Sequence, residues 1–281
     1  MSCVIVIPVY KSFSELTENE IKSIRQACKI LKQYPLFFTG TEALADTDAY
    51  LALATTEQVK AGFKVFPKKY FESIAGYNHL LLSKKFYKAF ARFEHILIYQ
   101  TDAYVFRDEL DYWCKKKYCY IGAPWFEGWS TPVTFTLVGV GNGGFSLRKT
   151  DKHIDILSRV AIIKRLKVFC RHIEMKQFSF FIMLVQLLNF RLKIKSKPSL
   201  HLLNELDEIN EDYFWGECVP VLFKDFQVAP VGDAMRFSFE ANPTYLYEKC
   251  GKRLPFGCHA WEKFDPVFWR TFFQAAEGNI K

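Results

Sequence analysis

Hydrophobic residues in the first part of the chain fall into short continuous runs separated by a run with helical spacing. Residues 3–10 (CVIVIPVY) and 35–40 (PLFFTG) are continuous apolar runs bounded by Pro or Gly, which is typical of buried strands. Between them, residues 14–34 carry apolar side chains near helical spacing, with Ser14 as the expected N-cap. The order strand, helix, strand predicts an α/β fold with a mostly parallel central sheet flanked by helices.

The same alternation continues through the rest of the chain. Further strands are expected at 64–66, 95–106 (HILIYQTDAYVF), 119–125 and 138–148, and helices at 76–93 and, with basic character, at 149–172. Residues 201–220 are expected to form an acidic helix or loop, followed by a tail of loops and short strands. We interpret residues 1–281 as one domain with a basic helical insertion at 151–200.

The net charge of the chain is concentrated in that insertion. The formal charge is +8, and residues 151–200, with eleven Lys or Arg and three Asp or Glu, account for all of it. Because these basic residues are mixed with apolar runs, two interpretations stay open: a helix that lies on an anionic membrane surface, or a helical hairpin that only packs on the core. Nucleic acid is not expected as a partner, because the segment has no recognised nucleic-acid motif.

The cysteines and the apolar runs bear on the location of the protein. Eight cysteines are scattered without a Cys-x-x-Cys pair or zinc-ligand spacing. The first expected strand starts at residue 3, leaving no room for a signal peptide, and the longest apolar run, 178–188, is too short to span a bilayer. We therefore expect a cytoplasmic protein, attached peripherally to the inner face of the membrane if the insertion binds lipid.

Asp102 is the first candidate for chemistry, because it interrupts the apolar run 95–106 where a buried strand should end. An unpaired buried carboxylate costs on the order of several kcal/mol, so a metal, a cation or backbone N–H groups should lie beside it. Ligands of open α/β sheets bind beyond the carboxyl ends of the strands. The residues that follow the first strand, Pro8, Val9, Tyr10 and Lys11, are therefore the first to consider, together with Asp102.

Three later blocks also carry polar chemistry: GNGGF (141–145), the adjacent acids Glu211 and Asp212, and His259 within FGCHAW. Each has an ordinary structural explanation. The glycines match neither the dinucleotide nor the Walker spacing and are typical of a turn. An acidic pair is usually a solvated surface, and a lone histidine is usually structural. The order of the blocks along the chain is what favours a functional interpretation.

In this order the blocks resemble the GT-A glycosyltransferases, most closely the inverting β1,3-galactosyl/N-acetylglucosaminyltransferase and Fringe type and related bacterial and fungal glycosyltransferase-like proteins of unknown substrate. Residues 77–106 resemble that family's Tyr-Asn-Leu-Thr-x-Lys helix followed by its Asp-x-Asp strand. GNGGFSLR resembles its Gly-Gly-aromatic segment, and NEDYFWG its Glu-Asp-Val-x-x-Gly motif. His259 falls where the family has a late metal-binding histidine.

The resemblance implies an inverting transfer from a nucleoside diphosphate sugar, with UDP as the expected nucleotide, to a glycan or lipid-linked acceptor, as in polysaccharide biosynthesis. Asp212 would be the general base, with Glu211 as the fallback. The donor-binding residues would be Pro8, Val9, Tyr10, Lys84, Thr101, Asp102, Asn142, Gly143 and Gly144. Mn²⁺ or Mg²⁺ would be held by Asp102 and His259. The site departs from Asp-x-Asp in having Gln100 in place of the first acid.

Flat aromatic side chains are the expected contacts of the sugar rings: Trp125, Trp129, Trp215 and Trp261. Two other classes of function remain as alternatives. A non-catalytic nucleotide-sugar or glycan-binding protein would need no base, so Asp212 with His259 favours transfer. Another α/β transferase, for instance of nucleotidyl groups, would need a glycine-rich loop after the first strand, and residues 8–15 contain no glycine.

Overall fold

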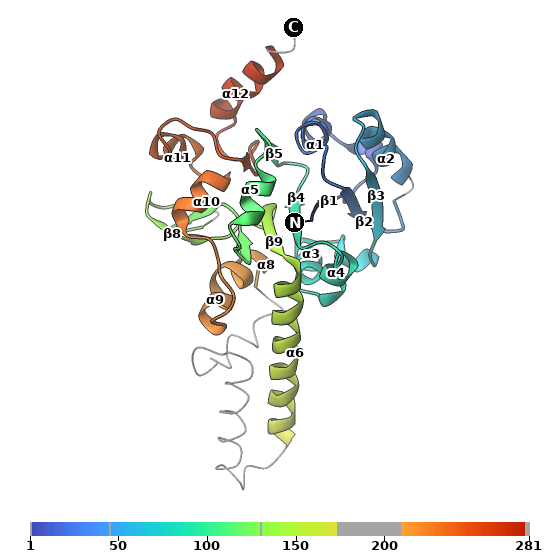
Figure 1. The fold of residues 1–281 in the computed structure, drawn as a ribbon, viewed down its shortest axis with the longest axis vertical. Coiled ribbons are helices and arrows are strands. Elements are labelled where there is room, and N and C mark those ends of the chain that lie inside the picture. The colour runs from blue at the N-terminus through green and yellow to red at the C-terminus, as the bar shows by residue number, and fades with distance from the viewer. Residues whose placement is uncertain (1, 45, 130, 173–208, 279–281) are drawn as a thin grey trace.

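The computed structural model describes residues 2–44, 46–129, 131–172 and 209–278, around a six-stranded sheet of order β3-β2-β1-β4-β9-β6 (Figure 1). Its strands are β1 (Cys3–Pro8), β2 (Leu36–Gly40), β3 (Ala61–Val65), β4 (His95–Tyr99), β6 (Tyr120–Ile121) and β9 (Phe145–Lys149). The first four pair in parallel, whereas β9 is antiparallel to both β4 and β6. The expected α/β fold with a mostly parallel sheet is therefore confirmed.

The direction of strand addition reverses between β1 and β4. The chain first builds outward from β1 to β2 and β3, and then returns to place β4 against the opposite edge of β1. Such a switch point leaves a crevice at the carboxyl ends of the two strands. Because β9 is antiparallel, with Phe145 opposite Tyr99, the loop before β9 lies at the carboxyl end of β4.

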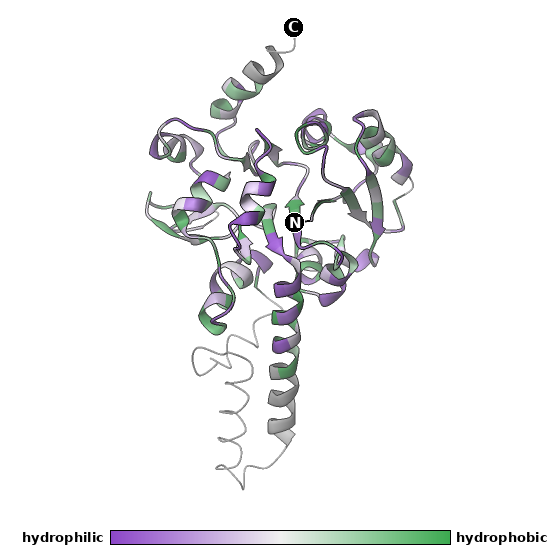
Figure 2. Cartoon of the chain, in the orientation of Figure 1, coloured by the Kyte–Doolittle hydropathy of each residue, from purple (hydrophilic) through white to green (hydrophobic). Residues whose placement is uncertain are grey.

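Helices cover both faces of this sheet. Alternate residues of β1 divide the core, since Ile5 and Ile7 pack with α1 (Glu18–Ile30) and α2 (Thr47–Thr56). On the other face Val4 and Val6 pack with α3 (Ile74–Leu81), α4 (Lys84–Ala89) and α6 (Thr150–His172). Figure 2 shows hydrophobic and hydrophilic residues side by side on α1 and α2, as expected for helices with one buried face.

Two predicted helix boundaries were wrong because capping side chains set different ones. Ser14 is not the N-cap of α1; it lies in the short 3₁₀ turn η1 (Phe13–Glu15), and Thr17 caps the helix in a reciprocal pair with Glu20. The helix expected at 76–93 is two helices, α3 and α4. Ser83 separates them, because its hydroxyl accepts the N–H of Phe86 at 3.3 Å and starts a new helix.

Three predicted strands are each divided in two. The run 95–106 forms β4 and then β5 (Tyr104–Val105), which joins β11 (Gly257–Cys258) and β10 (Ser238–Phe239) in a second sheet. The runs 119–125 and 138–148 likewise give β6 with β7 (Pro124–Phe126), and β8 (Leu137–Val140) with β9; β7 and β8 pair as a separate ribbon. Asp102 therefore lies in a turn between two sheets.

The predicted basic helix at 149–172 is present as α6, which extends away from the body of the molecule (Figure 1). Residues 173–200 of the basic insertion lie outside the described residues, so its two interpretations stay predictions. The chain is described again from 209, as α8 (Glu211–Tyr213), the π-helical segment η4 (Phe214–Cys218) and α9 (Val219–Leu222). Within the described ranges, none of the helices has the length and hydropathy of a membrane-spanning segment.

The tail is more helical than predicted. Instead of loops and short strands alone, residues 227–265 contain α10 (Val231–Phe237) and α11 (Pro243–Lys249), and α12 (Pro266–Gly278) follows them. Pro243 and Pro266 are the first residues of their helices, where a missing N–H costs nothing, and the prediction had taken proline as a loop signal. The remaining short helices are η2 (Lys68–Tyr70) and α5 (Leu110–Lys115).

Candidate functional site

A cavity of about 370 Å³ opens at the carboxyl ends of β1 and β4. Its walls contain three of the predicted donor-binding residues, Tyr10, Thr101 and Asp102. The full lining is Tyr10, Lys11, Thr17, Glu20, Gln100, Thr101, Asp102 and Glu262. The fold therefore brings the end of the first strand and the QTD turn together, at the place where open α/β sheets bind ligands.

Glu20, in the first turn of α1, joins the two sides of this strand-end cavity. One of its carboxylate oxygens lies 2.8 Å from the Lys11 ammonium, beyond β1. The other accepts the Thr101 hydroxyl at 3.3 Å, beyond β4. Burial alone would raise the pKa of Glu20, but Lys11 and Thr17 hold it below its usual value. The carboxylate is therefore ionised, and its ion pair with Lys11 fixes that side chain at the wall of the cavity.

Asp102 is held in place by a closed turn. The N–H of Gln100 donates to the carbonyl of Gly144 at 2.8 Å, and the N–H of Ala103 donates to the carbonyl of Gln100 at 2.9 Å. The carboxylate, 42% exposed, turns toward His259, with 3.2 Å between Asp102 Oδ1 and His259 Nε2. Although burial raises its pKa, His259 lowers it below the usual value overall. The sequence predicted that a partner must lie beside this carboxylate, and in the structure that partner is the imidazole of His259.

His259 is the centre of a polar cluster. Its Nδ1 lies 3.1 Å from Glu240 Oε1, and its Nε2 lies 3.0 Å from Gln100 Oε1 as well as near Asp102. Burial would lower the pKa of this histidine, but the carboxylates of Asp102 and Glu240 raise it to about 10. In the free protein the imidazole is therefore a cation that bridges two acids.

Asp102 and His259 are also the predicted metal ligands. In the part of the chain that the structure describes, no three His, Cys, Asp or Glu side chains are grouped to hold a metal ion. Asp102 and His259 Nε2 nevertheless face each other, and a carboxylate on Nδ1, here Glu240, is the usual partner of a metal-bound histidine. This donor set fits a hard divalent ion whose shell is completed by phosphate and water.

The glycines of the 141–144 loop allow close approach to these groups. A Cβ on Gly144 would lie 1.9 Å from His259 Nε2, and one on Gly143 would lie 2.1 Å from Glu211 Oε1. The buried residue Asn142 has a φ of 70°, and its side-chain oxygen accepts the N–H of Gly144 at 3.0 Å. The loop is therefore a turn, as its glycines predict, and it packs closely against His259 and Glu211.

Glu211 is tied up in a buried ion pair. Its two carboxylate oxygens each lie 2.7 Å from a guanidinium nitrogen of Arg148, on β9. Arg148 is fully buried and also donates to the hydroxyls of Tyr87 and Ser146, at 3.1 and 3.0 Å. With both oxygens engaged, Glu211 is poorly placed to accept a proton, so the geometry favours a positioning role for it.

Asp212, the next residue, has no such ion pair with any residue that the structure describes. One carboxylate oxygen accepts the N–H of Tyr213 at 2.9 Å. Burial, and then the negative charges of Glu211 and Glu240, raise its pKa to about 6. A carboxyl group with this pKa is ionised at neutral pH yet basic enough to accept a proton, which is the property of a general base.

The region that carries this chemistry matches a known protein family. The sequence profile of a family described as "Protein of unknown function (DUF5672)" matches residues 60–259. The chain belongs to this family. The matched region contains Asp102, the glycine loop, Asp212 and His259, and leaves out Tyr10 and Lys11, which follow β1. No curated protein sequence is significantly similar to this DUF5672 protein.

Several solved glycosyltransferase structures share a general likeness of fold with it. Mouse xyloside xylosyltransferase 1 is 11% identical with a TM-score of 0.48, covering 92% of this chain and 97% of its own. Core-mannan synthase A of Aspergillus fumigatus, in a Mn/GDP form, is 10% identical with a TM-score of 0.39, covering 56% of this chain and 63% of its own. GlyE of Streptococcus pneumoniae is 9% identical with a TM-score of 0.43, covering 92% and 54%. The chain thus spans less than two thirds of these last two proteins.

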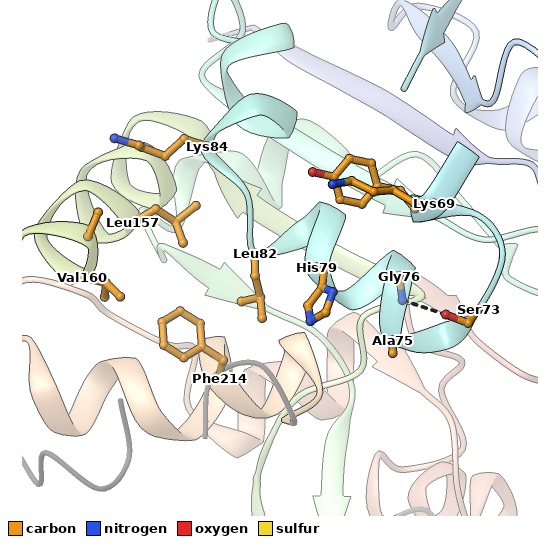
Figure 3. Close-up of a pocket in the computed structure, with 12 residues that line it drawn as sticks. Lys69, Ser73, Ala75, Gly76, His79, Leu82, Lys84, Leu157, Val160 and Phe214 are labelled. Carbon is orange, nitrogen blue, oxygen red and sulfur yellow. Dashed lines mark hydrogen bonds between the residues drawn. The ribbon is translucent and has the colours of Figure 1, made fainter. Parts of the chain in front are cut away.

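A second, larger cavity of about 660 Å³, between α3, α4, α6 and Phe214, shares no lining residue with the strand-end cavity. Lys84, predicted to lie near the donor diphosphate, lines this second cavity and not the strand-end cavity. Figure 3 shows its ammonium group pointing away from His79 and Phe214, two other residues of the lining. The donor-binding role of Lys84 stays a prediction. None of the other predicted donor-binding residues lines the same cavity.

The predicted tryptophans do not share one environment. Trp215 is fully buried, packed against Tyr87 and His153, and Trp261 is 6% exposed in another core cluster. The stacking role predicted for these two is therefore corrected to a role in the core. Trp125 is also buried, at 8% exposed, but its indole stacks against Trp129, which is 49% exposed.

Sequence reasoning missed Arg148 and Glu240, and it singled out Lys11 after the first strand without assigning it a donor contact. Arg148 gave a usable signal, because it is the one charged residue in the predicted strand run 138–148, as Asp102 is the first acid in its own run. Lys11 directly follows the residues that were predicted to contact the donor. Glu240 gave no signal of its own, because its partner His259 is 19 residues away and the bond depends on the second sheet.

Proposed function

We propose that the chain is an inverting glycosyltransferase that moves a sugar from a nucleoside diphosphate sugar to an acceptor hydroxyl. The observation that carries the proposal is Asp212, a partly buried carboxyl group with a pKa of about 6. It lies beside the Arg148–Glu211 ion pair, which in turn contacts Gly143 of the glycine loop. Gly144 of that loop accepts the N–H of Gln100, which lines the strand-end cavity. A protein that only bound a sugar would have no use for such a base.

The donor would occupy the strand-end cavity. Tyr10, 43% exposed, has an edge-on neighbour in Tyr77 at 5.6 Å and can offer a ring face to the nucleobase. The Lys11 ammonium and the Thr101 hydroxyl would contact the diphosphate, where a cation stabilises the charge that develops on the leaving group. UDP is the nucleotide to test first.

Asp212 would remove the proton of the acceptor hydroxyl. As the acceptor oxygen forms its bond to the anomeric carbon, the bond from that carbon to the diphosphate oxygen breaks, and its electron pair leaves with the diphosphate. The proton goes to Asp212, and the anomeric configuration inverts in the single displacement. General-base catalysis of this kind contributes roughly 10²–10⁴-fold to the rate.

Glu211 would position this base without being the base itself. Its carboxylate is fixed by Arg148, and its negative charge is one of the causes of the raised pKa of Asp212. Removing the pair would therefore change both the place and the pKa of the neighbouring carboxyl group.

Asp102 and His259 would hold the divalent ion, Mn²⁺ or Mg²⁺, with Glu240 orienting the imidazole. Such an ion, when bound, acts as a Lewis acid that neutralises phosphate charge. Gln100, in place of a second acid, contributes an amide oxygen that already contacts His259 at 3.0 Å.

The proposal is tested with a screen of UDP-, GDP- and dTDP-sugars for binding and turnover, with and without Mn²⁺. Asp212→Asn is expected to bind the active donor within about threefold of wild type and to lose transfer by roughly 10²–10⁴-fold. Glu217→Gln, which changes another partly buried carboxyl group in the next helical segment, is the matched control and should transfer normally. Absence of binding to any nucleotide sugar, or full activity of Asp212→Asn, would overturn the proposal.

A further inference from the structure

Three aromatic rings next to Asp212 form an aromatic platform, consisting of Trp125, Trp129 and Tyr213. The ring centroids of Trp129 and Tyr213 are 4.9 Å apart, and those of Trp125 and Trp129 are 5.9 Å apart at an interplanar angle of 28°. Trp125 and Tyr213 lie 6.4 Å apart at 26°. Trp125 is buried and Trp129 is half exposed, so the platform presents an indole at the surface with a second indole packed against it.

The platform rests directly on the glycine loop. A Cβ on Gly141 would lie 1.8 Å from the Trp125 indole, so only glycine allows β7 and the loop to approach this closely. The loop then continues to Gly143 and Gly144, which contact Glu211 and His259. The aromatic rings and the acidic groups thus share one supporting segment.

Trp129 is held in an unfavourable backbone conformation. Its φ is 51°, in the left-handed region that bulky residues rarely adopt. The turn between β7 and β8 maintains it, through the N–H of Trp129 to the carbonyl of Phe126 at 2.8 Å and the N–H of Val133 to the carbonyl of Glu127 at 2.9 Å. Strain of this kind costs about 1–3 kcal/mol and concentrates at functional positions.

Tyr213 connects the platform to the base, because it follows Asp212 and its N–H donates to that carboxylate. On the same hairpin, Glu127 accepts the hydroxyl of Thr134 at 3.0 Å, and Val133 and Phe135 are exposed. The exposed Trp129 indole is therefore an open aromatic surface, unlike the enclosed apolar cavity in which a ligand such as a lipid chain buries most of its surface.

We propose that the aromatic platform is the acceptor subsite and that the acceptor is a saccharide. A pyranose ring has one face of C–H groups that packs on a flat indole, while its hydroxyl groups at the edge remain available for polar contacts. A sugar stacked on Trp129 beside Tyr213 presents a hydroxyl toward Asp212. This inference rests on the proposed function for the reaction, but saccharide binding at the platform does not require turnover.

The test measures binding and transfer separately. Neutral oligosaccharides of glucose, galactose, mannose and N-acetylglucosamine are titrated into the protein and followed by ligand-observed NMR. Trp129→Ala is expected to weaken binding of the best oligosaccharide at least tenfold and to raise its KM as acceptor by a similar factor. Trp129→Tyr, which keeps a flat ring, should recover most of both. Thermal melting shows whether each variant is folded.

Phe135→Ala is the matched control, because Phe135 is on the same hairpin and is 59% exposed, but it stacks on Tyr245 and not on the platform. It should change neither quantity. Unchanged oligosaccharide binding in a folded Trp129→Ala, or absence of saccharide binding by the wild type, would overturn the subsite even if nucleotide sugars are turned over. Binding that depends on Trp129 in a protein that uses no nucleotide sugar would support the subsite and remove the proposed function.

Discussion

The guanidinium group of Arg148 and the carboxylate of Glu211 form a two-pronged ion pair, with both nitrogen–oxygen distances at 2.7 Å and both side chains buried. Arg148 is on β9, the second strand from one edge of the central sheet. Glu211 is 63 residues later in the chain, beside the proposed base. The pair therefore fixes the acidic segment to the sheet, and its loss should be felt in both stability and activity.

The first prediction concerns this pair. Arg148→Met should lower the free energy of unfolding by roughly 3–5 kcal/mol, because it leaves the Glu211 carboxylate buried without a partner. The double variant Arg148→Met/Glu211→Leu should recover much of that loss. Urea unfolding of the single and double variants measures the coupling. As a control, the exposed pair Lys68–Glu72, at 3.5 Å, should be worth less than about 1 kcal/mol. Additive effects at Arg148 and Glu211 would contradict the expectation.

The second prediction concerns pH. The folded state holds the Asp212 proton more tightly than the unfolded state, since its pKa rises from 3.8 to about 6. This contribution to stability is present below pH 4 and is lost as the pH rises through 6. Asp212→Asn should therefore gain stability relative to wild type on going from pH 4 to pH 8, by at most about 3 kcal/mol. Thermal melts at both pH values measure this, with Asp48→Asn on the surface of α2 as control. A constant difference between wild type and Asp212→Asn would mean that the pKa is not raised.

The third prediction concerns close packing at the glycine loop. Gly144→Ala would place a methyl group 1.9 Å from His259 Nε2, so the loop and the histidine must separate. We expect a loss of stability of about 1–3 kcal/mol together with weaker donor binding. Gly232→Ala, in α10 and with nothing within 4 Å of the added Cβ, should be neutral or stabilising by up to about 1 kcal/mol. Equal effects of the two substitutions on chemical unfolding would show that the loop is less crowded than described.

The fourth prediction separates two lysines. Lys11 lines the strand-end cavity and Lys84 lines the other cavity. If the diphosphate lies in the strand-end cavity, Lys11→Ala should weaken donor binding about tenfold, which corresponds to ~1.4 kcal/mol. Lys84→Ala should change it less than twofold. Calorimetric titration of the active nucleotide sugar measures both, and the reverse order of effects would place the diphosphate beside α4.

The fifth prediction concerns the divalent ion. Asp102→Ala should weaken donor binding in the presence of Mn²⁺ or Mg²⁺ but should have a smaller effect in EDTA, because the lost group is a proposed ligand of the ion. Thr101→Ala, one residue earlier, removes a hydroxyl and no proposed ligand, so its effect should be the same with and without metal. Identical behaviour of the two variants would make Asp102 a partner of His259 alone.

The strands were predictable from the sequence where they depend on local patterns of hydrophobic residues. Continuous apolar runs identified β1, β2 and β4, because strands buried on both faces contain little else. The same rule could not divide the 95–106 run, since β5 is as apolar as β4 and only its pairing with β11 assigns it to another sheet. Thr17 outcompeted Ser14 as a cap because Glu20 completes its reciprocal hydrogen bonds.

The candidate site was predictable as a set of segments but not as a set of contacts. The strand-end rule identified Tyr10 and Asp102 as neighbours, and the structure places both on one cavity. Burial is where the prediction failed: Trp215 reads in sequence like any exposed tryptophan next to an acidic pair, and tertiary packing puts it wholly inside the core. The position of Lys84 could not be predicted either, because Ser83 caps a separate helix, α4, on which Lys84 lines the other cavity.

The position of β1 in the middle of the sheet has a consequence for truncation. A fragment starting at residue 60 would retain the whole region that defines the family, together with Asp102, Asp212 and His259. It would lack β1 and β2, so β4 would become an open edge, a template for pairing with other chains. The same cut removes Tyr10, Lys11, Thr17 and Glu20, which are half of the residues that line the strand-end cavity. The family-defining segment is thus expected to aggregate when produced alone.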